Sequence, residues 1–394
     1  MNRASTKNRV LLPSKKEAAL AGKIDVRPVQ TKKDLMAFIK LPWKIYKNDP
    51  NWVPHLLMDR KKFFNKDKNP FFNENPTQLF LAYRDGELVG RIGAIINKLH
   101  NDYHKDKTGF FGFLEAVDDR DVFESLLNTA KAWLKERDRD LMIGPMNPST
   151  NDEVGFLSDG FDTPPYLMMT HTPPYYIEQM EALGYERAKE LLAYMIAYEN
   201  LTKNPKLDRV ANAIAKKYPV KIRKVDMKNF RAELEVVREI YNDAWAPNWG
   251  FVPMTPQEFD YVASDFKQII NPNVAFIGEY DGEAIGFLLA LPDYNQVFKK
   301  IRSGRLFPFG LFTFLFNKSK INSLRVITLG IKQKYQPFGI GSLFYQEIIK
   351  NAAPNGFNSA EMSWILEDND LMNKAAQLLG GYVHKRYRIY QTAL

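Results

Sequence analysis

The chain repeats itself once, at a spacing of 196 residues. The spacing holds for short sequence matches and for single residues spread over almost the whole repeat. Solenoid repeats are only about 20–50 residues long, so a period of this length indicates two copies of a whole domain. The matches in this register join residues 26–29 to 222–225, 75–76 to 271–272, and 80–90 to 276–286, and join Leu183, Gly184 and Tyr194 to Leu379, Gly380 and Tyr390.

Both copies predict the same order of elements. Each has a strand, helical stretches, two strands around a tight turn, and then alternating strands and helices. The turn residues Asp281 and Gly282 between apolar strands are a strong hairpin signal. This order predicts an α/β (α+β) fold of two tandem domains, each a mixed central sheet flanked by helices. We place a flexible basic tail at 1–23, the first domain at 24–200 and the second at 201–394.

Composition and charge limit the chemistry and the partners. The 394 residues contain no cysteine, which excludes disulfides, thiolate zinc sites and a cysteine nucleophile, and we expect no metal site. No apolar run reaches the roughly 18 residues of a membrane span, and the first 22 residues lack a signal-peptide core. We therefore expect a cytoplasmic protein. The net charge of +9 favours acidic partners: phosphorylated cofactors, anionic lipids or nucleic acid.

A glycine loop in the second copy carries the clearest chemical signal. The loop Gln336, Pro337, Phe338, Gly339, Ile340, Gly341, Ser342 lies between an apolar strand ending at Gly330 and Ile331 and a helical stretch at 343–351. Glycine tolerates unusual backbone conformations and lets the chain approach a ligand closely. The free N–H groups at the start of a helix suit a pyrophosphate. The pattern therefore predicts a phosphate-binding loop, although a plain strand-to-helix turn could also contain two glycines.

This loop resembles the signature of the GNAT superfamily of acyl-CoA-dependent N-acyltransferases, Gln/Arg-x-x-Gly-x-Gly/Ala. Asn369, eleven residues before Gly380, matches the family's next helix. The resemblance covers about residues 220–394 directly and the first copy through the repeat. It implies that acyl-CoA, as co-substrate, binds at Gly330, Ile331, 336–342 and Asn369, and that the other substrate is an amine.

The first copy departs from this signature. Its strand at 112–117 is followed at once by Asp118, Asp119, Arg120 and Asp121, without glycines. Three carboxylates at the place of a pyrophosphate would repel it. We therefore expect a degenerate first domain and one acyl-CoA per chain.

The second copy lacks the usual catalytic pair. The tyrosine that protonates the leaving thiolate in many family members is replaced by Ala376, and the strand at 326–331 has no carboxylate to act as base. The sequence leaves open whether other residues transfer the proton, whether positioning is enough, or whether the chain binds without turnover. Residues that could substitute lie on neighbouring elements: Glu361, Glu367, Tyr382 and Tyr390.

A polar, proline-rich insert at 145–175 in the first copy supplies further candidates. Its acceptor side chains suit an ammonium group that must be held and then deprotonated, and His171 has a reference pKa near 6.5. We expect Asp152, Glu153 and His171 to line the amine pocket. An ordered loop held by side-chain-to-backbone bonds is the alternative.

A second insert, at 306–316, is almost wholly apolar and is flanked by lysines and arginines. It is too short to cross a bilayer but suits peripheral contact with an anionic membrane. A cytoplasmic protein would make this contact at the inner face of the membrane. It could equally line an acyl channel, cover the sheet or join two chains in an oligomer.

The doubled architecture, this insert and the segments 144–147 and 363–367 resemble the bacterial ceramide-synthase-like GNAT proteins. That resemblance implies transfer of an acyl group to the amine of a long-chain or sphingoid base. The alternatives are acetyl transfer to a small amine and acyl-CoA or lipid binding without catalysis. Nucleic-acid binding is disfavoured, since the basic stretch 385–388 alternates like a strand and no repeated basic motif is present.

Overall fold

The computed structural model describes residues 22–202 and 205–394. Nearly all of the expected basic tail, residues 1–21, lies outside the described residues. The first copy forms β1 (Ile24–Pro28), α2 (Lys32–Ile45), α3 (Leu57–Phe63), α4 (Pro70–Glu74), β2 (Thr77–Arg84), β3 (Glu87–Ile95), α5 (Lys98–His104), β4 (Thr108–Ala116), α6 (Arg120–Lys135), β5 (Leu141–Gly144), β6 (Met146–Asn147), β7 (Glu153–Val154), β8 (Phe156–Asp159), α7 (Tyr175–Ala182) and β9 (Glu186–Ala197).

The second copy repeats this plan and adds helices of its own. It forms α8 (Tyr198–Thr202), α9 (Pro205–Lys217), β10 (Lys221–Lys224), α10 (Phe230–Trp245), α11 (Pro256–Phe266), β11 (Ala275–Tyr280), β12 (Glu283–Pro292), α12 (Asn295–Phe298), α13 (Leu311–Asn317), β13 (Ser323–Ile331), α14 (Gly341–Ala352), β14 (Ser359–Leu366), α15 (Asp370–Leu378) and β15 (Tyr382–Ala393). The mixed α/β architecture expected from the sequence is confirmed.

The two hairpins confirm the repeat at the level of single residues. Asp85 and Gly86 have φ of 50° and 82°, and Asp281 and Gly282 have φ of 50° and 78°. Positive φ at both central residues defines the two-residue turn whose twist matches the flanking strands. Each pair therefore connects two antiparallel strands, β2 to β3 and β11 to β12.

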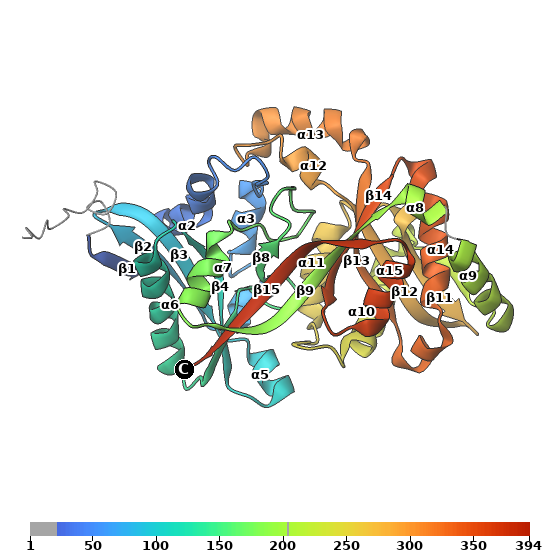
Figure 1. The fold of residues 1–394 in the computed structure, drawn as a ribbon, viewed down its shortest axis with the longest axis horizontal. Coiled ribbons are helices and arrows are strands. Elements are labelled where there is room, and N and C mark those ends of the chain that lie inside the picture. Colours follow the sequence, from blue (N-terminus) through green and yellow to red (C-terminus); the bar gives the residue numbers. More distant parts are fainter. Residues whose placement is uncertain (1–21, 203–204) are drawn as a thin grey trace, which may run out of the picture.

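One sheet runs through both copies of the described chain. Its thirteen strands have the order β1-β2-β3-β4-β5-β15-β9-β14-β13-β12-β11-β10, with β8 paired to β15. The last strand of each copy leaves its own half: β9 pairs with β14, and β15 pairs with β5. In Figure 1 the long strands β9 and β15 run side by side across the middle of the molecule. The division at residue 200, which falls within α8, stays a prediction, and the sheet is continuous across it.

The hydrophobic cores show the same exchange. Tyr194 on β9 belongs to the core built from the second copy's strands and α14. Its repeat partner Tyr390 on β15 packs in the first copy's core, beside Phe156 and α6. Both rings are almost fully buried. The repeated tyrosine therefore fills an equivalent place in the opposite half, which explains why it is present in both copies.

Candidate active site

The glycine loop lies between β13 and the start of α14. Gly339 has φ of 71°, a left-handed conformation that favours glycine, whereas Gly341 begins α14 without a positive φ. The conformational reason expected for both glycines thus applies to Gly339 only. A Cβ at Gly341 would meet its nearest neighbour, Ile331 Cδ1, at an ordinary 3.7 Å. Among the described residues, no side chain caps the N-terminus of α14. The N–H groups of Ser342 and Leu343 donate to the carbonyl oxygens of Gly339 (3.1 Å) and Ile340 (2.9 Å) in a tight first turn, so the helix offers an anion its positive end rather than a row of unpaired donors.

The other loop residues hold this geometry from inside. Gln336 Nε2 donates to the carbonyl oxygen of Ile331 at 3.0 Å, and Ser342 Oγ donates to that of Gly339 at 2.9 Å. Phe338 stacks on the ring of Tyr218, with centroids 4.6 Å apart. The remaining predicted residues are the buried Ile340, the exposed Pro337, and Gly330, where a Cβ would collide with the ring of Trp245.

The corresponding helix in the first copy is closed to an anion. Asp119 caps α6 with its own carboxylate, accepting from the N–H groups of Asp121 (3.0 Å) and Val122 (3.3 Å). Arg84 pairs with the same carboxylate. The helix end that would bind a pyrophosphate is therefore already occupied by a negative side chain.

The strands β13 and β14 separate beside the loop. They run parallel and pair only over residues 323–326 and 359–362. In the first copy β4 and β5 also pair only briefly, but there the gap is filled: the N–H of Phe113 donates to Asn147 Oδ1 at 2.6 Å. A Cβ on Gly112 would lie 1.7 Å from the carbonyl oxygen of Met146. Of these two wedges, only the one between β13 and β14 is left open by the neighbouring backbone.

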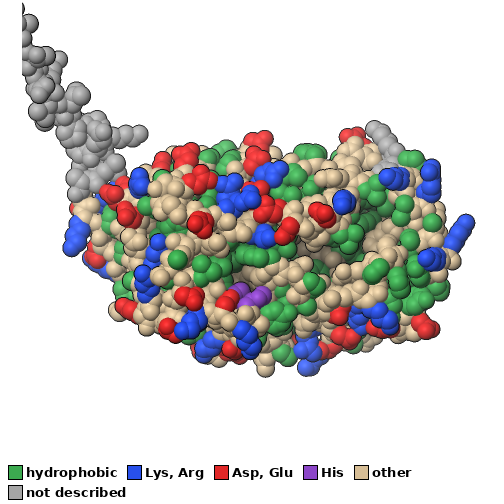
Figure 2. Space-filling model, turned by 60° about the horizontal axis from the view of Figure 1, so that its bottom comes forward, with side chains coloured by type: hydrophobic (Ala, Val, Ile, Leu, Met, Phe, Trp, Pro, Cys, Tyr) green, Lys and Arg blue, Asp and Glu red, His purple; other side chains and the backbone are tan. Residues whose placement is uncertain are grey.

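A largely apolar cavity of about 310 Å³ extends from this wedge. Its volume is at the lower end of the roughly 300–1,000 Å³ of ligand pockets. The face in Figure 2 has a hollow edged with hydrophobic side chains near its middle. The apolar wall comes from α10, α11 and the strands β11 to β13: Phe230, Leu234, Val237, Phe259, Val262, Ala263, Phe266, Ala275, Phe276, Phe287, Leu289 and Ile327.

The first copy contributes a carboxyl group to this cavity. Asp152, from the polar insert, is part of the lining and accepts a hydrogen bond from Ser149 Oγ at 2.8 Å. Burial raises the pKa of Asp152 to about 7, because little water is left to stabilise the charged form. The insert is tied to the second copy beside it: Tyr241 OH donates to Asn151 Oδ1 at 2.7 Å, and Thr150 Oγ1 to the carbonyl oxygen of Gly250 at 2.7 Å.

Two buried hydrogen-bonding groups of the lining have no partner among residues 22–202 and 205–394. They are Thr328 Oγ1 on β13 and Trp364 Nε1 on β14. Thr328 and Trp364 lie on the two strands that separate. An unpaired buried polar atom is costly, so these groups are candidates for contact with a substrate oxygen.

A polar network stands behind the cavity wall. Glu361 is completely buried, and its Oε2 lies 2.7 Å from His384 Nε2. Ser363 Oγ donates to Glu361 Oε1 at 2.7 Å and accepts from Arg325 Nε at 3.1 Å. Arg325 and Ser363 line the cavity, whereas Glu361 does not. The sequence identified Glu361 but not its partners, and the structure makes it a group that positions Ser363 and Arg325.

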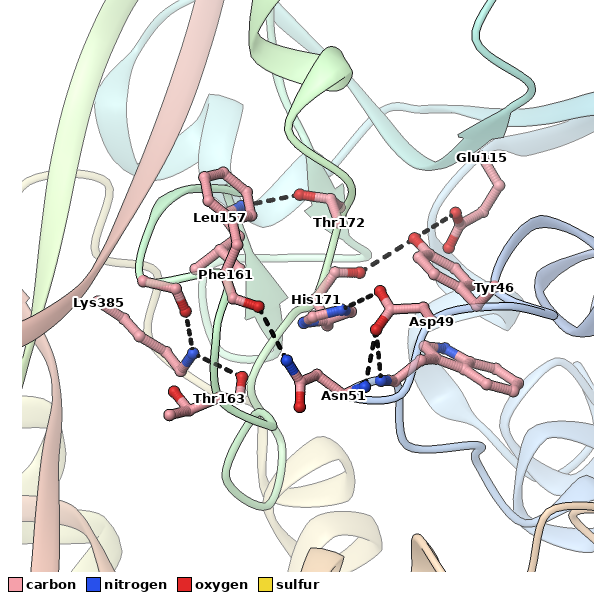
Figure 3. A network of polar contacts seen from close by, with 12 residues as sticks. Tyr46, Asp49, Asn51, Glu115, Leu157, Phe161, Thr163, His171, Thr172 and Lys385 are labelled. Carbon is pink, nitrogen blue, oxygen red and sulfur yellow. Dashed lines mark hydrogen bonds and ion pairs between the residues drawn. The ribbon is translucent and has the colours of Figure 1, made fainter.

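His171 lies in a different network, inside the first copy (Figure 3). Its Nε2 is 2.7 Å from Asp49 Oδ2, and its carbonyl oxygen accepts from Tyr46 OH at 3.0 Å. Lys385 Nζ holds the same insert by donating to the carbonyl oxygens of residues 160 and 163. His171 is not part of the cavity lining. Its contacts are those of a side chain that fixes the shape of the insert.

The other predicted residues also lie outside the lining. Glu153, which follows Asp152 in the sequence, is the first residue of β7. Glu367 accepts from the N–H of Glu190 at 3.1 Å, and Tyr382 is 60% exposed at the start of β15. Asn369 caps α15, accepting from the N–H of Met372 at 3.1 Å. Roles of these four residues in catalysis or cofactor binding stay predictions.

The sequence reasoning did not find most of the cavity. Thr328, Ser363 and Trp364 were missed as individual site residues, and so were the apolar residues of α10 and α11. Ala376, at the place of the usual tyrosine, is buried in the second copy's core and contributes no hydroxyl.

Comparisons with known proteins place the chain in a family. No family model matches it. It is 38% identical over 378 residues to the bacterial ceramide synthase of Caulobacter vibrioides, a match that covers 94% of this chain and 98% of that protein. It is 37% identical over 372 residues to protein YghO of Escherichia coli, covering 93% of this chain and 94% of that protein.

Solved structures give the fold. A tandem GNAT protein from the clavulanic acid biosynthesis pathway superposes with a TM-score of 0.54 at 12% identity, covering 94% of this chain and 98% of that one. At such low identity the likeness concerns the fold alone. Together with the relatives, it shows that this chain is a tandem GNAT-type N-acyltransferase and belongs to the family that includes the Caulobacter bacterial ceramide synthase.

Proposed function

We propose that the protein transfers an acyl group from acyl-CoA to the primary amine of a long-chain amine, of the sphingoid-base type. The observation that carries this proposal is the cavity: an apolar pocket of about 310 Å³ with a carboxyl group of raised pKa in its lining. An alkyl chain suits the apolar part, and an ammonium group suits Asp152. The name of the Caulobacter relative points to the same substrate class.

In this proposal the pyrophosphate of acyl-CoA binds at the start of α14, where no side chain caps the helix and its dipole is positive. The thioester lies in the wedge between β13 and β14. Thr328 Oγ1 and Trp364 Nε1, both unpaired in the described structure, are available to donate to its carbonyl oxygen. Donors aimed at an oxygen that gains negative charge stabilise the transition state.

Asp152 has two tasks in sequence. Its carboxylate binds the incoming ammonium and accepts one proton, leaving a neutral amine. The amine nitrogen then attacks the thioester carbonyl and loses a second proton as the carbon–sulfur bond breaks, and the departing thiolate takes up that proton to leave as the free thiol. A carboxyl group with a pKa of about 7 is a far better proton acceptor than an ordinary aspartate.

A second, smaller cavity offers a route for that proton. It has a volume of about 30 Å³ and shares Asp152 with the main cavity; Glu258 and Tyr261 also line it. This volume is enough for one water molecule, which needs polar partners of this kind. In the proposal, such a water carries the proton from Asp152 towards Glu258.

Calorimetric titration with acetyl-CoA and palmitoyl-CoA tests the donor. The variant Gly341→Glu is the cleaner probe, because Gly341 has no positive φ and its nearest Cβ contact is 3.7 Å. We expect it to fold normally and to lose CoA binding by charge repulsion. Lys350→Gln is the matched control. It lowers the net charge by the same one unit, at an exposed position at the other end of α14, and the variant should bind normally.

The outcomes of the titration distinguish a long-chain donor, an acetyl donor and no CoA donor. Tight palmitoyl-CoA binding that Gly341→Glu abolishes supports a lipid-modifying enzyme. A preference for acetyl-CoA would favour acetyl transfer to a small amine. Failure of both ligands to bind the unmodified protein would contradict the use of acyl-CoA.

A further inference from the structure

The segment between β12 and β13 carries an aromatic surface on the outside of the molecule. It contains α12, a helical turn at Leu306–Gly310 and α13, which stands at the edge of the fold in Figure 1. Of the ten large hydrophobic side chains that are exposed in the described residues, half lie here: Phe307, Phe309, Phe312, Leu315 and Phe316. Phe309 is 80% exposed and Phe316 71%. We call these five residues the aromatic surface.

The aromatic surface is held firmly by the other side of the same segment. Phe314 points inward and stacks on Tyr294 at 5.8 Å between centroids. Trp43 of α2 donates from Nε1 to the carbonyl oxygen of Arg302 at 2.8 Å, and the N–H of Leu57 donates to that of Gly304 at 2.8 Å. The exposed rings are therefore part of a packed element.

The charged side chains of the stretch that carries the aromatic surface, residues 294–322, all have the same sign. Residues 294–322 contain six cations and no aspartate or glutamate. The ion pairs found in the described parts of the chain involve none of these cations. The six are Lys299, Lys300, Arg302, Arg305, Lys318 and Lys320.

This charge decides between the two kinds of occupant that an apolar surface attracts. A second copy docked through the same surface would bring six cations against six, which repel each other. An anionic bilayer supplies negative headgroups for the cations and an acyl region for the rings. None of the helices in the described residues has the length and apolar character needed to span a bilayer. A peripheral contact requires neither.

We propose that the aromatic surface and its six flanking cations dock the protein onto an anionic lipid bilayer, with the phenylalanine rings inserted at the headgroup level. The inference stands on this segment alone and does not depend on the substrates of the active site.

Cosedimentation of the full-length protein with lipid vesicles tests the proposal. One set of vesicles is phosphatidylcholine, and the other contains phosphatidylglycerol as well. We expect binding to the anionic vesicles only, weakened by salt because screening reduces the attraction of exposed charges. The variant Phe309→Ser, Phe312→Ser, Phe316→Ser should lose at least about tenfold in vesicle partitioning, since binding scales with the apolar area inserted.

A control comes from a different helix of the second copy. Leu371 on α15 is 65% exposed, so Leu371→Ser removes a similar apolar group from another face and should bind vesicles normally. Replacing Lys318 and Lys320 by serine should weaken binding to anionic vesicles while the protein stays folded. Three results would overturn the proposal: no binding of the unmodified protein to either vesicle, equal binding to both, or undiminished binding of the triple variant. A dimer that the triple variant abolishes, without vesicle binding, would assign the surface to self-association.

Discussion

Filling the cavity from α11 should shorten the amine that the enzyme prefers. Ala263 is 3% exposed and lies in the apolar lining. The substitution Ala263→Leu places three more carbon atoms where the alkyl chain of the amine is proposed to lie. Each methylene group of the amine that is buried in the cavity contributes about 0.8 kcal/mol to the binding free energy. A chain that loses three such places should bind about 2.4 kcal/mol more weakly, a factor of roughly 60.

The assay is kcat/KM for a series of primary amines of increasing chain length, at a fixed acyl-CoA concentration. For the unmodified enzyme we expect kcat/KM to rise about fourfold per methylene until the cavity is full. Ala263→Leu should reach that plateau about three methylenes earlier. Ala232→Leu, an exposed change on α10, is the control and should leave the optimum unchanged.

The reasoning is refuted if Ala263→Leu keeps its thermal stability and the original amine optimum. The same variants measured with acyl-CoA donors of increasing length give a second check. A shift in the optimal donor, with the amine optimum unchanged, would assign the cavity to the acyl chain and contradict the amine assignment.

Three other outcomes follow from the polar groups of the site. Activity should rise with pH through about 7 as Asp152 ionises, and Asp152→Asn should lose this rise. The free energy of unfolding should change with pH in the opposite direction to the activity. Because the folded-state pKa of Asp152 lies above its ordinary 3.8, its contribution is greatest below that value and is lost as the pH rises towards 7, by at most about 1.4 kcal/mol per unit. Chemical unfolding at several pH values should therefore show Asp152→Asn losing less stability than the unmodified protein over that range. Thr328→Val and Trp364→Phe should lower kcat by about tenfold or more without lowering Tm, since each removes a buried group that has no partner within the described structure. A drop in Tm with unchanged kcat would mean that these groups serve the fold alone.

The sequence predicted the turns well, because their conformation depends on residues that are adjacent in the chain. The positive φ values of Asp281 and Gly282 follow from a two-residue turn that few other residues can adopt. Gly339 was identified in the same way, and its left-handed conformation bears out the turn. The sheet-flanking helix that the first copy's pattern requires is α6, whose N-terminus Asp119 caps.

Pairing over long distances was not readable from the same patterns. Nothing in the alternation of β9 or β15 says which neighbour each strand takes, and each pairs with the other copy. The cavity was missed for a similar reason. Its wall is an ordinary apolar helix face, and the cavity depends on how α10 and α11 pack around the strands and the first copy's insert, which no local pattern encodes. His171 was chosen for its chemistry, but its neighbours, Asp49 and Tyr46, come from a distant part of the sequence.

The exchange of β9 and β15 has a consequence for how the protein is made. β5 ends at residue 144, but its sheet partner β15 begins at residue 382, close to the C-terminus. Loop closure over so many residues is a slow step in folding. During synthesis the N-terminal half therefore leaves the ribosome with an open sheet edge, and the last twelve-residue strand closes it. The first copy's sheet therefore stays incomplete until residues 382–393 have been made. A gene cut between the two copies should yield a first copy without its sheet partner β15 and a second copy without β9.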